Sequence, residues 1–306
     1  MLAWLRLLRV PNLATAAADV LAGYLVVAGL RTVELPPAAC WWAIVAGLCF
    51  YAGGVVLNDV CDVDLDRRER PERPLPSGAI SVRAAATHAA TLLAIGAAAA
   101  CGAAVAARSP WPALVGAALS GAIWLYDRHA KGTAAGPAMM GACRGLAWLL
   151  GMTAAGGPLV VHQWAIPLGM AAYVAGITLF ARDEAGRSRV GPLAAGAALM
   201  AGGLAVAAGF VWLPLRLDGT VAGRPLPATT WLALWGIISA SIVLRAVVAI
   251  LDPSPVRVRL AVGNAIMSLI TLDAILVLAA CGEQWAVVVL LLLGVFVLGR
   301  QLVPPT

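Results

Sequence analysis

The sequence is poor in charge and almost devoid of lysine. Charged residues make up 12% of its 306 residues and hydrophobic residues 62%, which excludes a soluble globular domain. Lys131 is the single lysine among 21 basic residues. Because most arginines stand in short loops between apolar runs, we interpret them as determinants of membrane topology. The net charge of +6 therefore does not indicate a nucleic-acid-binding surface, and nucleic acid is not an expected partner.

Chemistry based on cysteine and histidine is also scarce. The six cysteines are scattered without a CxxC pair, so they indicate small core residues and neither a disulfide framework nor a zinc site. The three histidines, His88, His129 and His162, share no ligand spacing. The first ten residues lack a cleavage signature, so we expect no removable signal peptide. Their amphipathic pattern predicts a short interfacial helix.

Apolar runs long enough to cross a bilayer recur along the whole chain. About 20 apolar residues make one helical crossing, and without strict alternation such runs predict helices. We therefore expect an all-α polytopic protein embedded in the lipid bilayer, with nine or ten transmembrane helices in one domain, residues 1–306. The number depends on whether the last segment crosses completely. The segments are 11–30, 37–57, 83–106, 112–126, 137–155, 164–181, 192–213, 229–251, 260–281 and 285–302.

The basic residues predict how the bundle is oriented. If the segments cross in turn, fourteen arginine and lysine residues fall on one side, and four fall on the other: Arg31, Arg108, Arg216 and Arg224. The side with the excess is expected to be the cytoplasmic face of the plasma (inner) membrane. Three strongly polar loops, residues 59–81, 127–133 and 182–189, all lie on that side. We therefore expect the three loops to meet there.

The densest polar stretch follows the second apolar run. Residues 58–66 contain four aspartates, which are costly at the edge of a bilayer unless something binds there. Asn58, Asp62 and Asp66 stand four apart, so on a helix they share one face. Oxygen ligands grouped in this way suit Mg²⁺ with a phosphate, and the arginines that follow would neutralise the same anion. A solvated charged loop is the alternative interpretation.

A family resemblance separates these alternatives. The pattern NDxxDxxxD of residues 58–66, followed by RPLPSG at 73–78, resembles the first signature of the UbiA superfamily of intramembrane prenyltransferases. Weaker similarities follow in order: residues 9–12 with Asp19 and Gly23, then Tyr126 with Lys131, then Gly141, Arg144 and Gly151. The resemblance extends over about residues 6–280 and implies a UbiA-like helical bundle.

The resemblance also implies a reaction. Members of this family bind an allylic polyprenyl diphosphate through Mg²⁺, ionise it, and pass the prenyl group to a small, often aromatic, acceptor. Metal and cationic side chains would stabilise the departing diphosphate. The motif positions assign Asn58, Asp62 and Asp66 to Mg²⁺, Asp59 to the adjoining substrate site, Arg73, Arg128 and Lys131 to the diphosphate, and Tyr126 to the carbocation.

The family's second signature, two aspartates four apart, falls in residues 180–188 and is incomplete. One alignment places Glu184 and Ser188 at the two positions, and a shift by one places Asp183 and Arg187 there. The resemblance then makes Glu184 a catalytic metal ligand and makes Asp183, Arg187 and Ser188 substrate contacts. Together with residues 140–146, this departure resembles UbiA-like proteins of the EboC type. A lipid or small-molecule carrier is therefore retained as the alternative to an enzyme.

Several charged residues lie inside the predicted spans. An intramembrane charge indicates function by default, although pairing within the bundle is the simpler explanation. Arg144 lies near the cytoplasmic end of its span, and we predict that it binds substrate. For Asp19 and Asp273 the two interpretations stay open, with Asp273 a candidate for the acceptor site.

Overall fold

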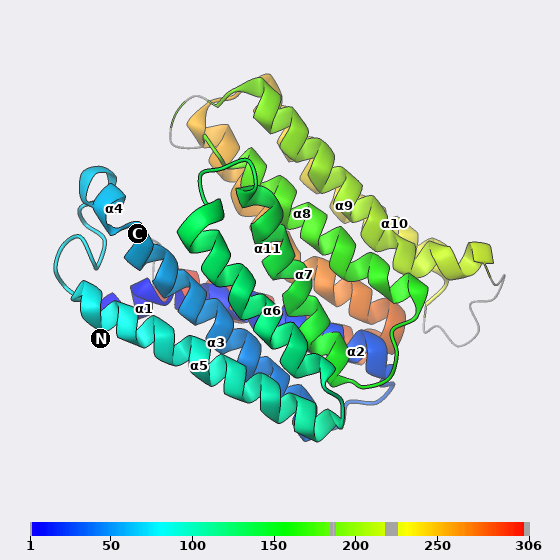
Figure 1. The fold of residues 1–306 in the computed structure, drawn as a ribbon. Helices are drawn as coiled ribbons and strands as arrows, with labels where there is room; N and C mark the ends of the chain where they lie inside the picture. Colours follow the sequence, from blue (N-terminus) through cyan, green and yellow to red (C-terminus); the bar gives the residue numbers. More distant parts are fainter. Residues whose placement is uncertain (1, 184–185, 187, 218–225, 303–306) are drawn as a thin grey trace.

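The computed structural model describes residues 2–183, 186, 188–217 and 226–302 (Figure 1). Within these ranges the chain forms helices and no strands, as the apolar runs predict. Ten long helices follow the ten segments in order: α2 (Leu13–Ala28), α3 (Ala38–Cys61), α5 (Val82–Ala107), α6 (Trp111–Leu125), α7 (Gly136–Ala154), α8 (Ala165–Phe180), α9 (Val190–Leu217), α10 (Ala228–Leu251), α11 (Pro255–Cys281) and α12 (Glu283–Leu302). Five short elements complete the described chain: α1 (Leu2–Leu7), η1 (Val10–Asn12), α4 (Val63–Glu69), η2 (Tyr126–Ala130) and η3 (Val161–Trp164).

Eight of the described helices are long and apolar enough to cross a membrane. The two long helices outside this group are α6, which has 15 residues, and α7, which carries Arg144 and several glycines. Helix α7 packs against α2, α6 and α8, so it needs no continuous apolar surface of its own. The protein is an integral membrane helical bundle, as the sequence predicts.

Helix α12 extends along the whole length of α2. Near its first residue, Trp285 Nε1 donates to the carbonyl of Thr32, just beyond the end of α2, at 2.9 Å. Near its last residue, Gly299 lies against Pro11, just before the start of α2. The final apolar segment therefore spans the same length of the bundle as α2, and it is long and apolar enough to cross a membrane.

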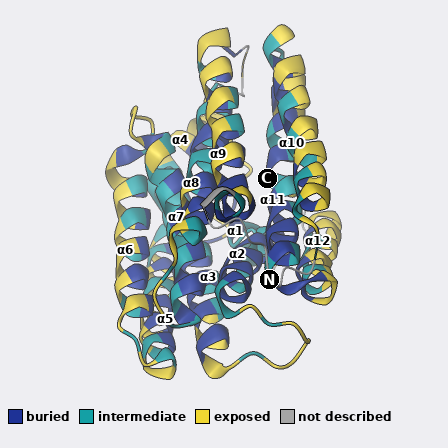
Figure 2. Cartoon of the chain, turned by 90° about the vertical axis from the view of Figure 1, so that its right-hand side faces the viewer, coloured by how far each residue is buried: buried dark blue, intermediate teal, exposed yellow. Residues whose placement is uncertain are grey.

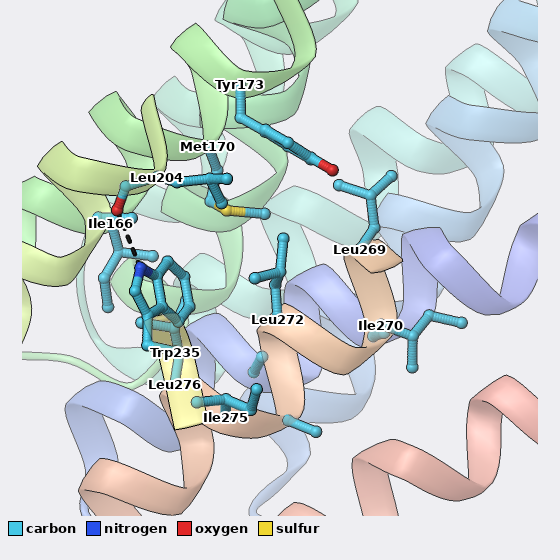
Figure 3. Packing of buried hydrophobic residues seen from close by; sticks show 14 of the residues in the cluster. Ile166, Met170, Tyr173, Leu204, Trp235, Leu269, Ile270, Leu272, Ile275 and Leu276 are labelled. Carbon is cyan, nitrogen blue, oxygen red and sulfur yellow. Dashed lines mark hydrogen bonds between the residues drawn. The ribbon is translucent and has the colours of Figure 1, made fainter. Parts of the chain in front are cut away.

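Helix α2 lies at the centre of the bundle, and the helices around it present their exposed faces outward (Figure 2). In its most apolar stretch 72% of the residues are buried inside the protein, against 17% for α12. One hydrophobic core joins α2 to α8, α9, α10 and α11, and a second joins it to α3, α5, α6 and α7. Figure 3 shows the first core, where Trp235 Nε1 donates to the carbonyl of Leu204 at 3.1 Å, so its buried polar atom is satisfied.

Helices α2 and α7 approach so closely that only glycine fits between them. A Cβ added to Gly151 would lie 2.0 Å from the carbonyl oxygen of Val20, and a Cβ on Gly23 would lie 2.5 Å from the carbonyl oxygen of Trp148. Small residues at such contacts let backbones pack directly in a membrane. The contact holds α2 against α7, the helix that carries Arg144.

We expect Gly151→Ala to lower the thermal stability of the detergent-solubilised protein by about 1–3 kcal/mol, because the methyl group forces α7 away from α2. Gly121→Ala is the matched control, since a Cβ at Gly121 meets no atom within 4 Å. Melting curves of the two variants test this. Equal melting temperatures for both variants would show that the α2–α7 contact is looser than the structure indicates.

Candidate active site

Polar loops that are far apart in sequence meet at one end of the bundle, where α4 also lies (Figure 1). Asn58 Nδ2 donates to Asp127 Oδ1 at 2.8 Å, which joins the first loop to the second. Arg182 Nη2 donates to the carbonyl of Gly132 at 3.0 Å, which joins the second loop to the third. The prediction that the three loops come together is therefore confirmed.

The acidic motif lies across a break between two helices. Helix α3 ends at Cys61, α4 begins at Val63, and Asp62 between them has φ −90° and ψ 0°. Backbone hydrogen bonds nevertheless run from Asp62 N to Asn58 O at 3.0 Å and from Asp66 N to Asp62 O at 2.8 Å. The one-turn spacing of the three motif residues is thus preserved through the break. Their side chains, however, have different partners.

Each of three motif carboxylates is paired with a cation. Lys131 Nζ forms an ion pair with Asp62 Oδ2 and also donates to Asn58 Oδ1 at 3.0 Å. Arg73 Nη1 donates to Asp66 Oδ2 at 2.7 Å, and both residues are buried. The turns around Arg73 that the sequence predicts are present, and they carry this arginine back onto α4.

Arg9 completes this set of ion pairs from the N-terminus. Its Nη2 donates to Asp59 Oδ1 at 2.9 Å, and Arg73 Nη1 lies 4.0 Å from the same oxygen. The Arg9 backbone is left-handed, with φ 45° and ψ 49°, which an arginine rarely adopts. Such outliers persist where surrounding contacts hold them, often at functional sites. Sequence reasoning placed Arg9 in a motif but did not assign it to the site.

Asp127 is a site residue that sequence reasoning missed. Residues 127–133 were expected to form a loop, but residues 126–130 continue α6 as the wider π-helical turn η2, closed by Lys131 N donating to Tyr126 O at 2.9 Å. The loop expectation is therefore wrong for residues 127–130 and confirmed for residues 131–133. The π-helical turn accommodates one extra residue, a feature frequent at functional sites. A usable signal existed, since Asp127 is the only acid of the second loop and directly follows Tyr126.

Burial raises the pKa of Asp127 to about 6, against the hydrogen bond from Asn58 and the charge of Lys131, which lower it. The folded protein therefore holds this proton more tightly than the unfolded chain does. The resulting stabilisation is complete below the ordinary value of 3.8 and is lost as the pH rises through about 6.

We expect Asp127→Asn to gain stability relative to the wild type as the pH rises from 4 to 6.5, by at most about 3 kcal/mol, and then to hold that gain. Melting curves recorded without divalent cations across this range measure the difference. Asp64→Asn is the control, because the Asp64 side chain is 80% exposed and pairs with Arg67 on the surface of α4. If the difference in stability between the wild type and Asp127→Asn did not change with pH, the raised pKa of Asp127 would be contradicted.

The third loop is only partly described. Ser188 is buried, and its hydroxyl donates to the carbonyl of Asp183 at 3.2 Å, so it faces its own loop. The carboxylate of Asp183 accepts from Arg189 Nε at 3.1 Å. Glu184 and Arg187 lie outside the described residues. Arg128 is exposed at the rim of the second loop, and Tyr126 is half-buried at the start of η2.

Arg144 lies deeper, among the membrane-spanning helices. Its Nη1 contacts Asp19 Oδ2 at 2.7 Å, which links α7 to α2. The fully buried carboxyl group of Asp273 on α11 interacts electrostatically with both residues. The structure thus shows the pairing expected of an internal ion pair, and the predicted substrate contact of Arg144 stays a prediction.

The fold and site together define a class: an integral membrane helical bundle with paired carboxylates and cations gathered at one end. Residues 19–254 match the UbiA prenyltransferase family, and the chain belongs to that family. Among curated relatives it is 43% identical over 90 residues to a digeranylgeranylglyceryl phosphate synthase of Methanoculleus marisnigri, covering 29% of this chain and 30% of the relative. It is 35% identical over 149 residues to the synthase of Halobacterium salinarum, covering 48% and 49%. The matches thus span less than half of each relative's length.

Solved structures share the fold at lower identity. One, described as giving insights into digeranylgeranylglyceryl phosphate synthase in membranes, aligns with a TM-score of 0.65 and 20% identity over 92% of this chain and 98% of that one. A UbiA homologue from Aeropyrum pernix aligns at 0.61 and 17%, over 90% and 98%. A homologue from Archaeoglobus fulgidus bound to DMAPP and Mg²⁺ aligns at 0.53 and 17%, over 81% and 99%.

Proposed function

We propose that this prenyltransferase ionises an allylic polyprenyl diphosphate with the help of Mg²⁺ and transfers the prenyl group to a small acceptor. The observation that carries the proposal is the convergence of Asn58, Asp62 and Asp66 with Lys131 and Arg73 at the membrane edge. A diphosphate bound there would place its prenyl chain toward the apolar interior of the bundle. The excess of arginine on this side supports a cytoplasmic orientation for the site.

The residues present fit a magnesium ion. In the described part of the chain no three His, Cys, Asp or Glu side chains form a metal-binding group. However, Mg²⁺ is held by one or two carboxylates together with phosphate oxygens and water, so it does not require three. The ion pairs of Asp62 and Asp66 each use one oxygen of the carboxylate, Oδ2. The second oxygen of each and the side-chain carbonyl oxygen of Asn58, which accepts a hydrogen bond from Lys131 Nζ, would supply the hard ligands, and the ion would neutralise diphosphate charge.

The cationic side chains have a separate task at this site. Each of the three cations forms an ion pair with one aspartate: Lys131 with Asp62, Arg73 with Asp66, and Arg9 with Asp59. Because their counter-charges hold them in place, they need little reorganisation to face negative charge that develops on a departing diphosphate. Arg128, exposed at the rim, contributes a further positive charge.

The carbocation requires a different environment. Tyr126 stands at the junction of α6 and η2 beside Asp127, at the membrane edge, so its ring can present a π-face to a cation formed there. The apolar helices below would hold the prenyl chain and exclude water, which otherwise would quench the cation. Asp183, Arg187 and Ser188 are proposed to contact the substrate from the third loop.

Glu184 is proposed as the metal ligand of the third polar loop, residues 182–189. We expect Glu184→Ala to raise the Mg²⁺ concentration needed for half-maximal activity about 10–100-fold. Glu69→Ala, which removes an exposed acid at the end of α4, is the control and should not change it. If both variants needed the same Mg²⁺ concentration for half-maximal activity, Glu184 would not be a metal ligand.

The substrate class comes from the relatives. Several are named digeranylgeranylglyceryl phosphate synthases, and Archaeoglobus fulgidus homologues have been solved with DMAPP or GPP and Mg²⁺. We therefore propose short and long allylic diphosphates as donors. A prenylated glycerol phosphate and a phenolic acid are the two acceptor chemistries to compare.

The test uses purified full-length protein in detergent with Mg²⁺, a series of allylic diphosphates and both acceptors. We expect diphosphate release and a prenylated product that depend on Mg²⁺ and on one acceptor. Tight binding of diphosphates without turnover by any acceptor would instead favour the carrier hypothesis. Absence of Mg²⁺-dependent binding would overturn the proposal entirely.

A further inference from the structure

A second charged feature lies away from the candidate active site, in a groove between α10 and α11. The groove has a volume of about 310 Å³ and is lined by Ser241, Leu244, Arg245, Val248, Arg257 and Leu260, among others. Arg245 stands six residues before the end of α10, which is about 9 Å along the helix axis from that end. Its side chain is exposed on the surface of a membrane-spanning helix.

This position is unfavourable for an arginine without an anion. Only 22% of the most apolar stretch of α10 is buried inside the protein, and exposed residues follow the helix along its length in Figure 2. Arg245 therefore faces lipid, where a charge is costly unless it is paired. Across the described ranges, no carboxylate forms an ion pair with Arg245.

The other walls of the groove match one kind of ligand. Arg257 lies near the start of α11, closer to the membrane surface, and its Nε is 3.6 Å from Asp252. Ser241 is one helical turn below Arg245 on the same face and supplies a hydroxyl group. Leu244 and Leu260 are 64% and 58% exposed, so they offer apolar surface to acyl chains. Two guanidinium groups above an apolar wall are complementary to a phosphate with lipid chains.

We propose that this groove binds an anionic phospholipid of the surrounding bilayer, with its phosphate between Arg245 and Arg257 and its acyl chains along Leu244 and Leu260. The groove adjoins the candidate active site through one contact. The turn between α10 and α11 accepts a hydrogen bond at Pro253 O from Ser188 N, at 3.2 Å. A bound lipid therefore steadies the turn on which the third polar loop rests.

The test measures lipid binding and requires no turnover. Full-length protein in neutral detergent is titrated with phosphatidylglycerol or phosphatidylcholine, and bound lipid is counted by native mass spectrometry alongside melting temperature. We expect phosphatidylglycerol to bind at least tenfold more tightly and to raise the melting temperature. Arg245→Ala should abolish this preference, and Arg245→Lys should retain much of it because the charge remains. Arg259→Ala removes an arginine on α11 that does not line the groove and should behave as wild type.

Three results would overturn the proposal. Equal binding of phosphatidylcholine would show that Arg245 only extends toward the membrane surface, as any long cationic side chain does. An equal loss in Arg259→Ala would indicate a diffuse surface charge. Full competition by inorganic phosphate at the same concentration as the lipid would show that the site recognises a free anion. Arg245→Ala and Arg245→Lys are compared by their melting curves without lipid, so that a folding defect is recognised.

Discussion

Asp62→Asn is expected to reduce prenyl transfer about 10²–10³-fold while the protein remains folded. The Asp62 side chain is 17% exposed and forms an ion pair with Lys131, so the substitution keeps the shape of the site and removes its charge. An amide oxygen is a weaker ligand for Mg²⁺ than a carboxylate because it carries no negative charge, and Lys131 loses the carboxylate that orients it. Both effects act on the charge that develops on the diphosphate. The measurement is kcat/KM for diphosphate release at saturating acceptor.

Asp64→Asn is the matched control, two residues further along the chain. The Asp64 carboxylate is 80% exposed and contacts Arg67 at 2.7 Å on the surface of α4. The same change in charge at this position should leave kcat/KM within twofold of the wild type. If Asp62→Asn retained activity within tenfold of the wild type, the first signature would not bind the reacting diphosphate.

Arg144→Met is expected to cost about 3–5 kcal/mol of stability, the largest structural effect we foresee. The change leaves the carboxylate of Asp19, which is 1% exposed, without its cation in the membrane interior, next to the buried Asp273. Adding Asp19→Asn should recover much of the loss, because the double variant no longer buries the Asp19 charge. Thermal unfolding of the two single variants and the double variant forms the required cycle.

The exposed ion pair of Arg67 and Asp64 is the control for the loss of stability in Arg144→Met. Its nitrogen and oxygen are 2.7 Å apart, the same separation as in the Arg144–Asp19 pair. Because water screens an exposed pair, Arg67→Met should change stability by no more than about 1 kcal/mol. A variant Arg144→Met that melts like the wild type but binds diphosphate weakly would instead assign Arg144 to the substrate, as its position in the predicted span suggests.

The first signature shows how far residue spacing predicts a site. Four-residue steps from Asn58 to Asp66 predicted a shared helical face, and the backbone hydrogen bonds maintain that spacing. Spacing did not predict the break at Asp62, which gives the motif carboxylates separate cationic partners. The π-helical turn that carries Asp127 was not predicted either. A π-helical turn depends on what packs around the chain, and no local pattern in residues 126–130 announces it.

The sequence by itself determined the helical class, the order of the helices and the meeting of the polar loops at one end of the bundle. These follow from the length of apolar runs and the placement of arginine, both of which act locally through the bilayer. Only the tertiary structure decided which charges meet: Arg9 with Asp59, Lys131 with Asp62, and Arg144 with Asp19. Pairing across distant helices depends on how closely glycine contacts such as that of Gly151 bring the backbones together. That distance is a property of the packed bundle, and no single segment encodes it.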